Sequence, residues 1–305
     1  MKFISAQPAS LYYAWQAEVM INNFLSMGIK GEDIHLVCAK ISPEVGGDWL
    51  ALQKGYPAQF FFYEDSRADK AYQPGVQAHI LEKHWRENPD LDNEAVFFHD
   101  VDFIFTRPFD FTPFLKDDIW YFSDTVSYLG AHYIQYKGEE VLDAMCNSIG
   151  INKGLVIDNQ KNSGGAQKLF KNITADYWKL VYDNQIKLWY AMGTVEHIKK
   201  EGDPYGIQRW TASMWAELWT GWLLGHEIRV PKEFDFCWAT DGVSRWKELA
   251  FFHNAGVTGP QHRQFFKANY IERLPYGEDL DINTDSASYK YWQWVKAVGL
   301  NSVLI

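Results

Sequence analysis

The first hundred residues alternate short apolar runs with longer stretches of helical periodicity, and this alternation constrains the fold most strongly. Strands are predicted over residues 2–6, 34–39, 60–63 and 95–98, and helices over 10–26 and 74–85. Strands that alternate with helices predict an α/β fold, with a mostly parallel sheet flanked by helices. Ligands of such sheets bind beyond the carboxyl ends of the strands, so polar residues that follow apolar strands are the first candidates for a site.

The composition limits the classes of protein to which the chain can belong. Its 305 residues are 47% hydrophobic and 22% charged, which is enough to bury a large core and excludes global disorder. We expect a single domain over residues 1–305. The formal net charge of −10 argues against a general nucleic-acid or membrane binder, although a local basic patch is compatible with it.

Targeting and redox signals are few. Cys38, Cys146 and Cys237 lie far apart without a C-x-x-C pair, which excludes a disulfide framework and a thiolate zinc site. We therefore expect buried free thiols in a reducing compartment. Residues 1–16 lack the apolar stretch of a secretion signal, and no run of 18 apolar residues occurs. These features favour a cytoplasmic protein without a membrane span, in a bacterial or phage-infected cell.

The second half is less regular. A strand is predicted over residues 154–158, a polar loop over 159–165, and helices over 167–182, 210–225 and 289–297. Short strands are predicted over 227–230 and 249–253. Tryptophans recur at helical spacing in 210–225, which indicates a buried packing stripe, with one ring left to line an acceptor groove.

The segment 95–105 (AVFFHDVDFIF) is the most informative in the chain. Asp100 and Asp102 form a D-x-D between two apolar strands, where uncompensated carboxylates would be costly to bury. A divalent cation, Mn²⁺ or Mg²⁺, would compensate them and bridge to phosphate oxygens. The alternative is a strand end whose acids cap a turn or pair with Arg107. His253 ends another apolar strand and is the candidate third ligand; its alternative is a hydrogen-bonded strand-end histidine.

These residues resemble a known family. A D-x-D after a central strand, with a late histidine, is similar to nucleotide-sugar glycosyltransferases of the GT-A fold, which is Rossmann-like. The nearer likeness is to hydroxyproline arabinosyltransferases and peptidyl-serine galactosyltransferases. It rests on Y-x-x-W-Q at 12–16, on DVDFIFTRP at 100–108, and on WTASMW at 210–215, where those families have W-x-x-E-M-Y. Ser213 replaces the family's glutamate, and Glu217 lies one helical turn further along.

The resemblance implies a division of labour along the chain. Residues 1–110 are expected to bind the nucleotide, and residues 111–305 to hold the donor sugar and, on an aromatic-rich helical region, the acceptor. It also implies that Ala6 and Gln7, after the first strand, contact the base or ribose. An ordinary strand–helix turn is the alternative for both.

Three further groups could meet the donor. Arg67 and Lys70 precede a helix and are candidates for phosphate or base, against a solvated charged turn. Gly164 and Gly165 read as the entry to a helix, whose free backbone N–H groups would bind an anion or sugar hydroxyls, against a simple entry turn. Lys267 is a candidate to neutralise the leaving diphosphate, against a basic surface loop.

The sequence thus predicts a metal-dependent glycosyltransferase that moves a hexose or a pentose such as arabinose from a UDP-sugar to a hydroxyl. Acceptors left open are a glycan, a protein and a hydroxymethylated pyrimidine in phage DNA, for which 261–273 supplies some basic residues. Glu217 or Asp241 would be the general base of an inverting reaction, whereas a retaining one needs none. The competing hypotheses are a metal-dependent phosphohydrolase or nucleotidyltransferase, and a non-catalytic carbohydrate-binding protein.

Overall fold

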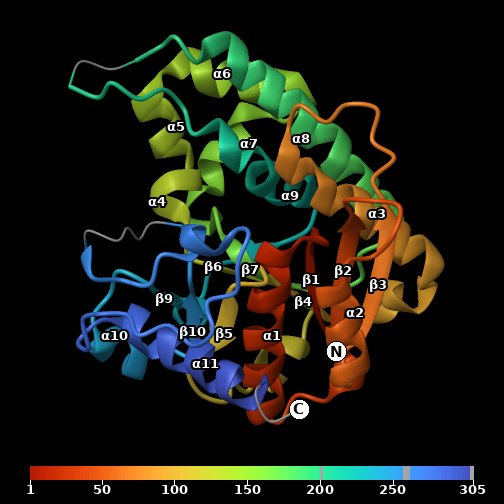
Figure 1. The fold of residues 1–305 in the computed structure, drawn as a ribbon. Coiled ribbons are helices and arrows are strands. Elements are labelled where there is room, and N and C mark those ends of the chain that lie inside the picture. The colour runs from red at the N-terminus through yellow and green to blue at the C-terminus, as the bar shows by residue number, and fades with distance from the viewer. Residues whose placement is uncertain (200–201, 257–261, 303–305) are drawn as a thin grey trace. The chain divides into compact units, whose positions relative to one another are not determined.

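The computed structural model describes residues 1–199, 202–256 and 262–302 (Figure 1). Internal contacts divide the chain into two compact units, each discontinuous in sequence. Unit 1 contains Asp65–Phe98 and Thr112–Lys232, together with Met1. Unit 2 contains Lys2–Glu64, His99–Phe111 and the described residues from Glu233 onward. Both units combine strands with flanking helices, so the predicted α/β class is confirmed.

Unit 2 begins with three parallel strands in the order β3-β2-β1, which are β1 (Lys2–Pro8), β2 (Ile34–Lys40) and β3 (Gln59–Glu64). Helix α1 (Leu11–Ser26) connects β1 to β2, and α2 (Gly47–Gly55) connects β2 to β3. The ring of Trp49 on α2 lies 6.4 Å from that of Phe60 and 6.2 Å from that of Phe62. The predicted strands and helix of this region are confirmed, while α2 was not predicted.

A second sheet in unit 2 has the order β5-β10-β9, with β5 (Phe103–Phe105), β10 (Phe251–His253) and β9 (Phe236–Trp238). Strand β10 is antiparallel to β5 and parallel to β9. Helix α10 (Val243–Glu248) precedes β10, and α11 (Ala287–Ser302) packs against α1 and β9 (Figure 1). The pairing of β5 with β10 was not predicted, because it joins segments almost 150 residues apart.

Unit 1 has four strands in the order β4-β7-β6-β8, which are β4 (Val96–Phe98), β7 (Gly165–Phe170), β6 (Trp120–Ser123) and β8 (Ile228–Arg229). Strand β7 is antiparallel to both β4 and β6. Helix α8 (Ala175–Val195) packs against α3 (Val76–Glu87), α6 (Glu139–Ile149) and α9 (Ala212–Leu223). The short helices α4 (Val126–Leu129), α5 (Ala131–Lys137) and α7 (Lys153–Asp158) complete the unit.

Two predictions for unit 1 are wrong. Residues 154–158 form α7 instead of a strand, because Asn152 caps a helix: its Oδ1 accepts from the backbone N–H of Gly154 at 2.7 Å and of Leu155 at 3.4 Å. The helix predicted over 167–182 is split into β7 and α8. All six residues of β7 are buried, and pairing with strands on both sides overrides the local helical pattern.

Two expectations about the whole chain can be compared with the described residues. All three cysteines are buried free thiols, as expected. Within residues 1–199, 202–256 and 262–302, no helix has both the length and the apolar character that a membrane span requires. The assignment of functions to residues 1–110 and 111–305 stays a prediction.

Candidate metal centre

The site is built on the short turn that leads into β5. His99 donates its backbone N–H to the carbonyl of Ile4 on β1, and its ring packs 5.1 Å from Phe24 and 5.4 Å from Phe103. Burial lowers the pKa of His99 to about 4, so its ring is neutral at physiological pH. The backbone N–H of Phe103 then bonds to the carbonyl of Asp100. An apolar anchor on each side therefore holds Asp100 and Asp102 in a defined turn.

His253 reaches the same turn through the pairing of β10 with β5. It lies opposite Phe103, the residue after Asp102, and the backbone N–H of Asn254 bonds to the carbonyl of Asp102 at 3.0 Å. The histidine is therefore placed by a backbone ladder within unit 2. This pairing brings the imidazole next to the two carboxylates.

Asp100, Asp102 and His253 offer one ligand atom each, and the three atoms lie within 4.8 Å of one another. Nε2 of His253 is 3.2 Å from Oδ1 of Asp102 and 3.5 Å from Oδ2 of Asp100. Adjacent ligands of an octahedral ion with bonds of about 2.1 Å are about 3.0 Å apart. The two distances from His253 therefore fit neighbouring positions around one divalent cation, and one imidazole with two carboxylates is a donor set suited to Mn²⁺ or Mg²⁺.

Lys267 is a fourth member of this centre. Its ammonium forms an ion pair with Oδ2 of Asp102, and the side chains of Lys267 and Asp102 are 15% and 5% exposed. Burial alone would raise the pKa of Asp102, but Lys267 and His253 outweigh it and hold that pKa well below its usual range. Burial would lower the pKa of His253, but the two aspartates outweigh it and raise that pKa. The Lys267 ammonium and the His253 imidazole thus both stabilise the buried carboxylate of Asp102.

Tyr12 and Tyr13, at the start of α1, lie near the charged residues of the metal centre. The sequence did not predict this position for the two tyrosines. Burial raises the pKa of Tyr12, and Lys267 and Asp102 are among the charges that act on its hydroxyl. Burial, Tyr12 and Asp100 raise the pKa of Tyr13 to about 12. The Y-x-x-W-Q segment therefore supplies neutral phenols beside the charged cluster. The Y-x-x-W-Q motif was the feature of the sequence that could have pointed to these tyrosines, but it indicated only a family resemblance.

The two candidate bases lie in different units. Asp241 belongs to unit 2 and follows β9, where its Oδ2 accepts from the backbone N–H of Trp238 at 2.9 Å. Glu217 lies on α9 in unit 1 and forms an ion pair with Lys168 of β7; their side chains are 5% and 4% exposed. Both carboxylates therefore have local structural partners, and their catalytic role stays a prediction.

Ala6 and Gln7 are interior residues of β1, since this strand continues to Pro8 instead of ending at Ala6. Both are buried, and the side-chain amide of Gln7 donates to Sγ of Cys38 at 3.2 Å. The sequence predicted that both residues lie in a loop between strand and helix, but both lie within the strand. Their contact with a nucleotide stays a prediction.

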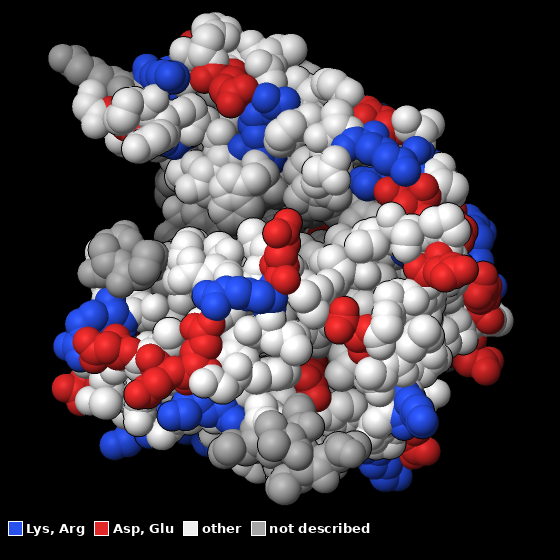
Figure 2. Space-filling view, viewed as in Figure 1, with Lys and Arg blue, Asp and Glu red and all other residues white. Residues whose placement is uncertain are grey.

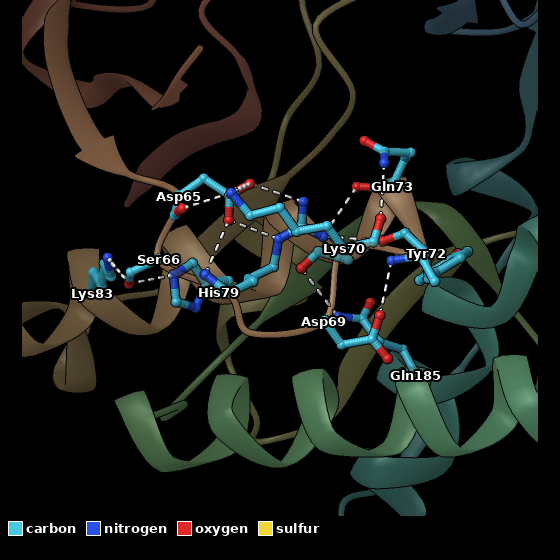
Figure 3. Close-up of polar contacts among 12 residues, drawn as sticks. Asp65, Ser66, Asp69, Lys70, Tyr72, Gln73, His79, Lys83 and Gln185 are labelled. Atoms are coloured by element: carbon cyan, nitrogen blue, oxygen red, sulfur yellow. Dashed lines mark hydrogen bonds and ion pairs between the residues drawn. The ribbon is translucent and has the colours of Figure 1, made fainter. Parts of the chain in front are cut away.

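Arg67 and Lys70 belong to a polar segment of unit 1 that follows β3, and Figure 3 shows Lys70 beside Asp65 and Gln73 of this segment. The Arg67 guanidinium donates to both carboxylate oxygens of Asp65, at 2.8 and 3.0 Å, and to the carbonyl of Tyr72 at 3.0 Å. Its side chain is only 2% exposed, whereas that of Lys70 is 54% exposed. Burial opposes ionisation of Asp65, but Arg67 outweighs it and lowers the pKa of Asp65 to about 2. Arg67 therefore braces the segment, and Lys70 is the more accessible cation.

Gly164 and Gly165 lead into strand β7, so the prediction that they open a helix is wrong. A Cβ on Gly164 would lie 2.5 Å from Cβ of Phe122, and one on Gly165 would lie 2.5 Å from Cε of Met214. Close packing of this strand accounts for both glycines, and the helix N-terminus proposed for anion binding is not formed here. Their role in a donor-sugar pocket stays a prediction.

Gly164→Ala is expected to lower the free energy of unfolding by about 1–3 kcal/mol, the usual cost of overpacking. The added methyl would also approach the backbone carbonyl of Ser123 to 2.9 Å, so a rotamer change cannot relieve the clash. Urea unfolding followed by far-UV circular dichroism measures the change. Gly46→Ala is the control, since a Cβ there meets nothing within 4 Å. Equal stability of the two variants would contradict this account.

The basic residues predicted near 261–273 are largely neutralised. Arg263 pairs with Asp281 at 2.5 Å, Arg273 with Glu278, and Lys267 with Asp102. On the face drawn in Figure 2, basic and acidic side chains are interspersed. Residue 261 lies outside the described residues. These pairings weaken the argument for a basic strip that would follow a nucleic-acid backbone.

Comparison with solved structures identifies the fold. No protein-family model matches the chain, and a search of curated proteins finds no match either. The galactosyltransferase LgtC, solved with donor and acceptor sugar analogues, matches 97% of this chain and 95% of its own at 13% identity, with a TM-score of 0.50. The bifunctional glycosyltransferase WbbM matches 96% of this chain at 10% identity, also with a TM-score of 0.50. This chain spans about half (51%) of WbbM. At these identities the likeness shows a shared fold, of the GT-A type.

Proposed function

We propose that the chain is a metal-dependent glycosyltransferase that uses a nucleotide sugar, in the first place a UDP-sugar. The observation that carries the proposal is the convergence of Asp100, Asp102 and His253, whose ligand atoms lie within 4.8 Å of one another, in a chain with this fold. A buried D-x-D with a histidine is suited to a divalent ion that also binds phosphate oxygens. The structural similarity to LgtC and WbbM supports the same reading, since both are glycosyltransferases.

The metal centre contains residues that could hold the metal ion and residues that could bind the diphosphate of the donor. Asp100, Asp102 and His253 would hold Mn²⁺ or Mg²⁺, and the bound ion would act as a Lewis acid toward the diphosphate. Lys267 would leave Asp102 when the metal binds, which frees its ammonium to donate to a phosphate oxygen. The neutral hydroxyls of Tyr12 and Tyr13 would add hydrogen-bond donors without adding charge.

The acceptor is proposed to be a glycan or a protein hydroxyl. The pairing of Arg263, Lys267 and Arg273 with acids makes a hydroxymethylated pyrimidine in DNA the less favoured choice. Asp241 is the first candidate for a base of an inverting reaction, because it shares unit 2 with the metal ligands. Transfer of a pentose such as arabinose, and membership of the arabinosyl- and galactosyltransferase group, remain proposals that rest on the sequence motifs.

A thermal-shift panel of nucleotide sugars, with and without Mn²⁺, tests the proposal. We expect the largest rise in melting temperature when Mn²⁺ and a UDP-sugar are present together, because each ligand that binds the folded state stabilises it. Mass analysis of the same mixtures separates transfer or slow release of sugar from release of a nucleoside monophosphate. The latter product would support the competing phosphohydrolase, and absence of any metal-dependent shift would contradict the metal centre.

Lys267→Met is expected to tighten the binding of Mn²⁺ alone by at least about tenfold. A hydrogen bond to a charged group contributes about 1.5–3 kcal/mol, and in the wild type the metal must displace that contact from Asp102. Isothermal titration calorimetry without nucleotide measures the effect. Lys30→Met is the matched control, since Lys30 is in the same unit and its side chain is 75% exposed. Unchanged or weaker binding of Mn²⁺ by the Lys267 variant would show that the lysine does not compete.

A further inference from the structure

Unit 1 contains a pocket that includes none of the metal ligands or candidate bases. It has a volume of about 600 Å³, within the range of about 300–1,000 Å³ typical of small-molecule sites. Its walls come from the end of α5, the C-terminal part of α8 and the segment 203–210 that leads into α9. All of these residues belong to unit 1, whereas the metal ligands belong to unit 2.

Aromatic rings dominate the pocket. Tyr133, Trp189, Tyr205 and Trp210 line it. Tyr205 is 76% exposed and Trp210 is 61% exposed, which is unusual for rings of this size in a chain that buries most of its tryptophans. Exposed aromatic side chains beside a pocket mark a binding surface, because they leave a large apolar face in water. The C–H faces of pyranose rings are the ligands whose shape and polarity match such a surface.

The charged side chains that line the pocket form two ion pairs. Lys137 pairs with Asp203 at 2.5 Å and donates to the carbonyl of Tyr205, and Arg209 pairs with Glu196 at 2.7 Å. The Arg209 guanidinium also stacks 3.9 Å from the Trp189 ring. The pocket therefore has no net charge from these residues, yet it presents fixed donors and acceptors side by side. A pair of adjacent hydroxyls satisfies such a set, since each can both donate and accept.

We propose that this pocket binds a neutral oligosaccharide through ring stacking on Tyr205 and Trp210 and hydrogen bonds to the two ion pairs. Anionic ligands are disfavoured because each cation already has a carboxylate partner. A proline-rich peptide could also use aromatic rings, but it carries few donors to match the carboxylates. Binding at this pocket is expected to need neither metal nor nucleotide.

The test measures binding of four hexasaccharides, namely maltohexaose, cellohexaose, mannohexaose and xylohexaose, by saturation-transfer NMR in the presence of EDTA. At least one of them is expected to bind the wild-type chain. Trp210→Ala and Tyr205→Ala are each expected to weaken that binding at least about fivefold, from the loss of one stacking face. Tyr190→Ala is the matched control: Tyr190 is 51% exposed in the same unit but does not line the pocket.

Several results would overturn the proposal. The first is that none of the four hexasaccharides binds. The second is that Tyr190→Ala weakens hexasaccharide binding as much as Trp210→Ala does. The third is that a decaproline peptide or a single-stranded DNA dodecamer binds more tightly than the hexasaccharides and loses that binding in Trp210→Ala. Melting curves of each variant show whether it is folded, and Tyr205→Phe, which keeps the ring, should retain most of the affinity. EDTA removes metal from the centre in unit 2, so hexasaccharide binding is measured without the proposed transferase activity. Failure of either proposal therefore leaves the other one standing.

Discussion

Asp100→Asn and Asp102→Asn are each expected to weaken Mn²⁺ binding at least about 100-fold, whereas only the second lowers stability. Either change removes an anionic ligand, a larger loss than the effect of about 10–100-fold seen when a residue behind the ligands is changed. The Asp102 side chain is 5% exposed and balances Lys267, while the Asp100 side chain is 44% exposed. Breaking a buried ion pair lowers the free energy of unfolding by about 3–5 kcal/mol. Asp102→Asn is therefore expected to lose both metal affinity and stability.

Titration of Mn²⁺ by electron paramagnetic resonance gives the affinity, and urea unfolding gives the stability. Asp48→Asn, an exposed acid on α2 in the same unit, is the control for a generic loss of negative charge. If Asp100→Asn kept full affinity for Mn²⁺, the three-ligand centre would be wrong. This variant keeps the question answerable even if Asp102→Asn does not fold.

The parts of the fold that follow from local periodicity were predictable. Strands β1 and β2 and helix α1 have patterns in which most apolar residues of each segment are buried together. The candidate metal site at the D-x-D was also predictable, because burying two carboxylates between apolar strands is costly unless a cation neutralises them. His253 was found by the same reasoning, as a polar residue that ends an apolar run.

The rest depended on contacts distant in sequence. Strand β7 has a helical pattern but lies between β4 and β6, and no local feature of the sequence indicates those partners. The ion pair of Lys267 with Asp102 spans 165 residues, so the lysine was expected to meet phosphate without its present partner. Glu217 was selected as a base because α9 resembles a family motif, yet its partner Lys168 lies in the segment expected to be a helix.

Glu217→Gln is expected to lower the free energy of unfolding by about 3–5 kcal/mol, because it leaves the buried ammonium of Lys168 uncompensated. That ammonium lies 5.1 Å from the ring centre of Phe98, whose face can replace only part of the lost attraction. Replacing both charges with apolar groups of similar volume is often neutral, so Lys168→Met with Glu217→Leu should recover most of the stability. Urea unfolding monitored by tryptophan fluorescence measures all three proteins.

The double variant also separates a structural carboxylate from a catalytic one. If it is stable and still transfers sugar, Glu217 is not the base, and Asp241 becomes the remaining candidate for an inverting reaction. If it is stable and inactive, while Glu217→Gln is no less stable than the wild type, the buried pair contributes little and the carboxylate acts in the chemistry. The burial of both charged side chains, at 4% and 5% exposure, leads us to expect the first result. A solvated pair would contribute at most about 1 kcal/mol, and a loss no larger than that in Glu217→Gln would contradict the buried ion pair.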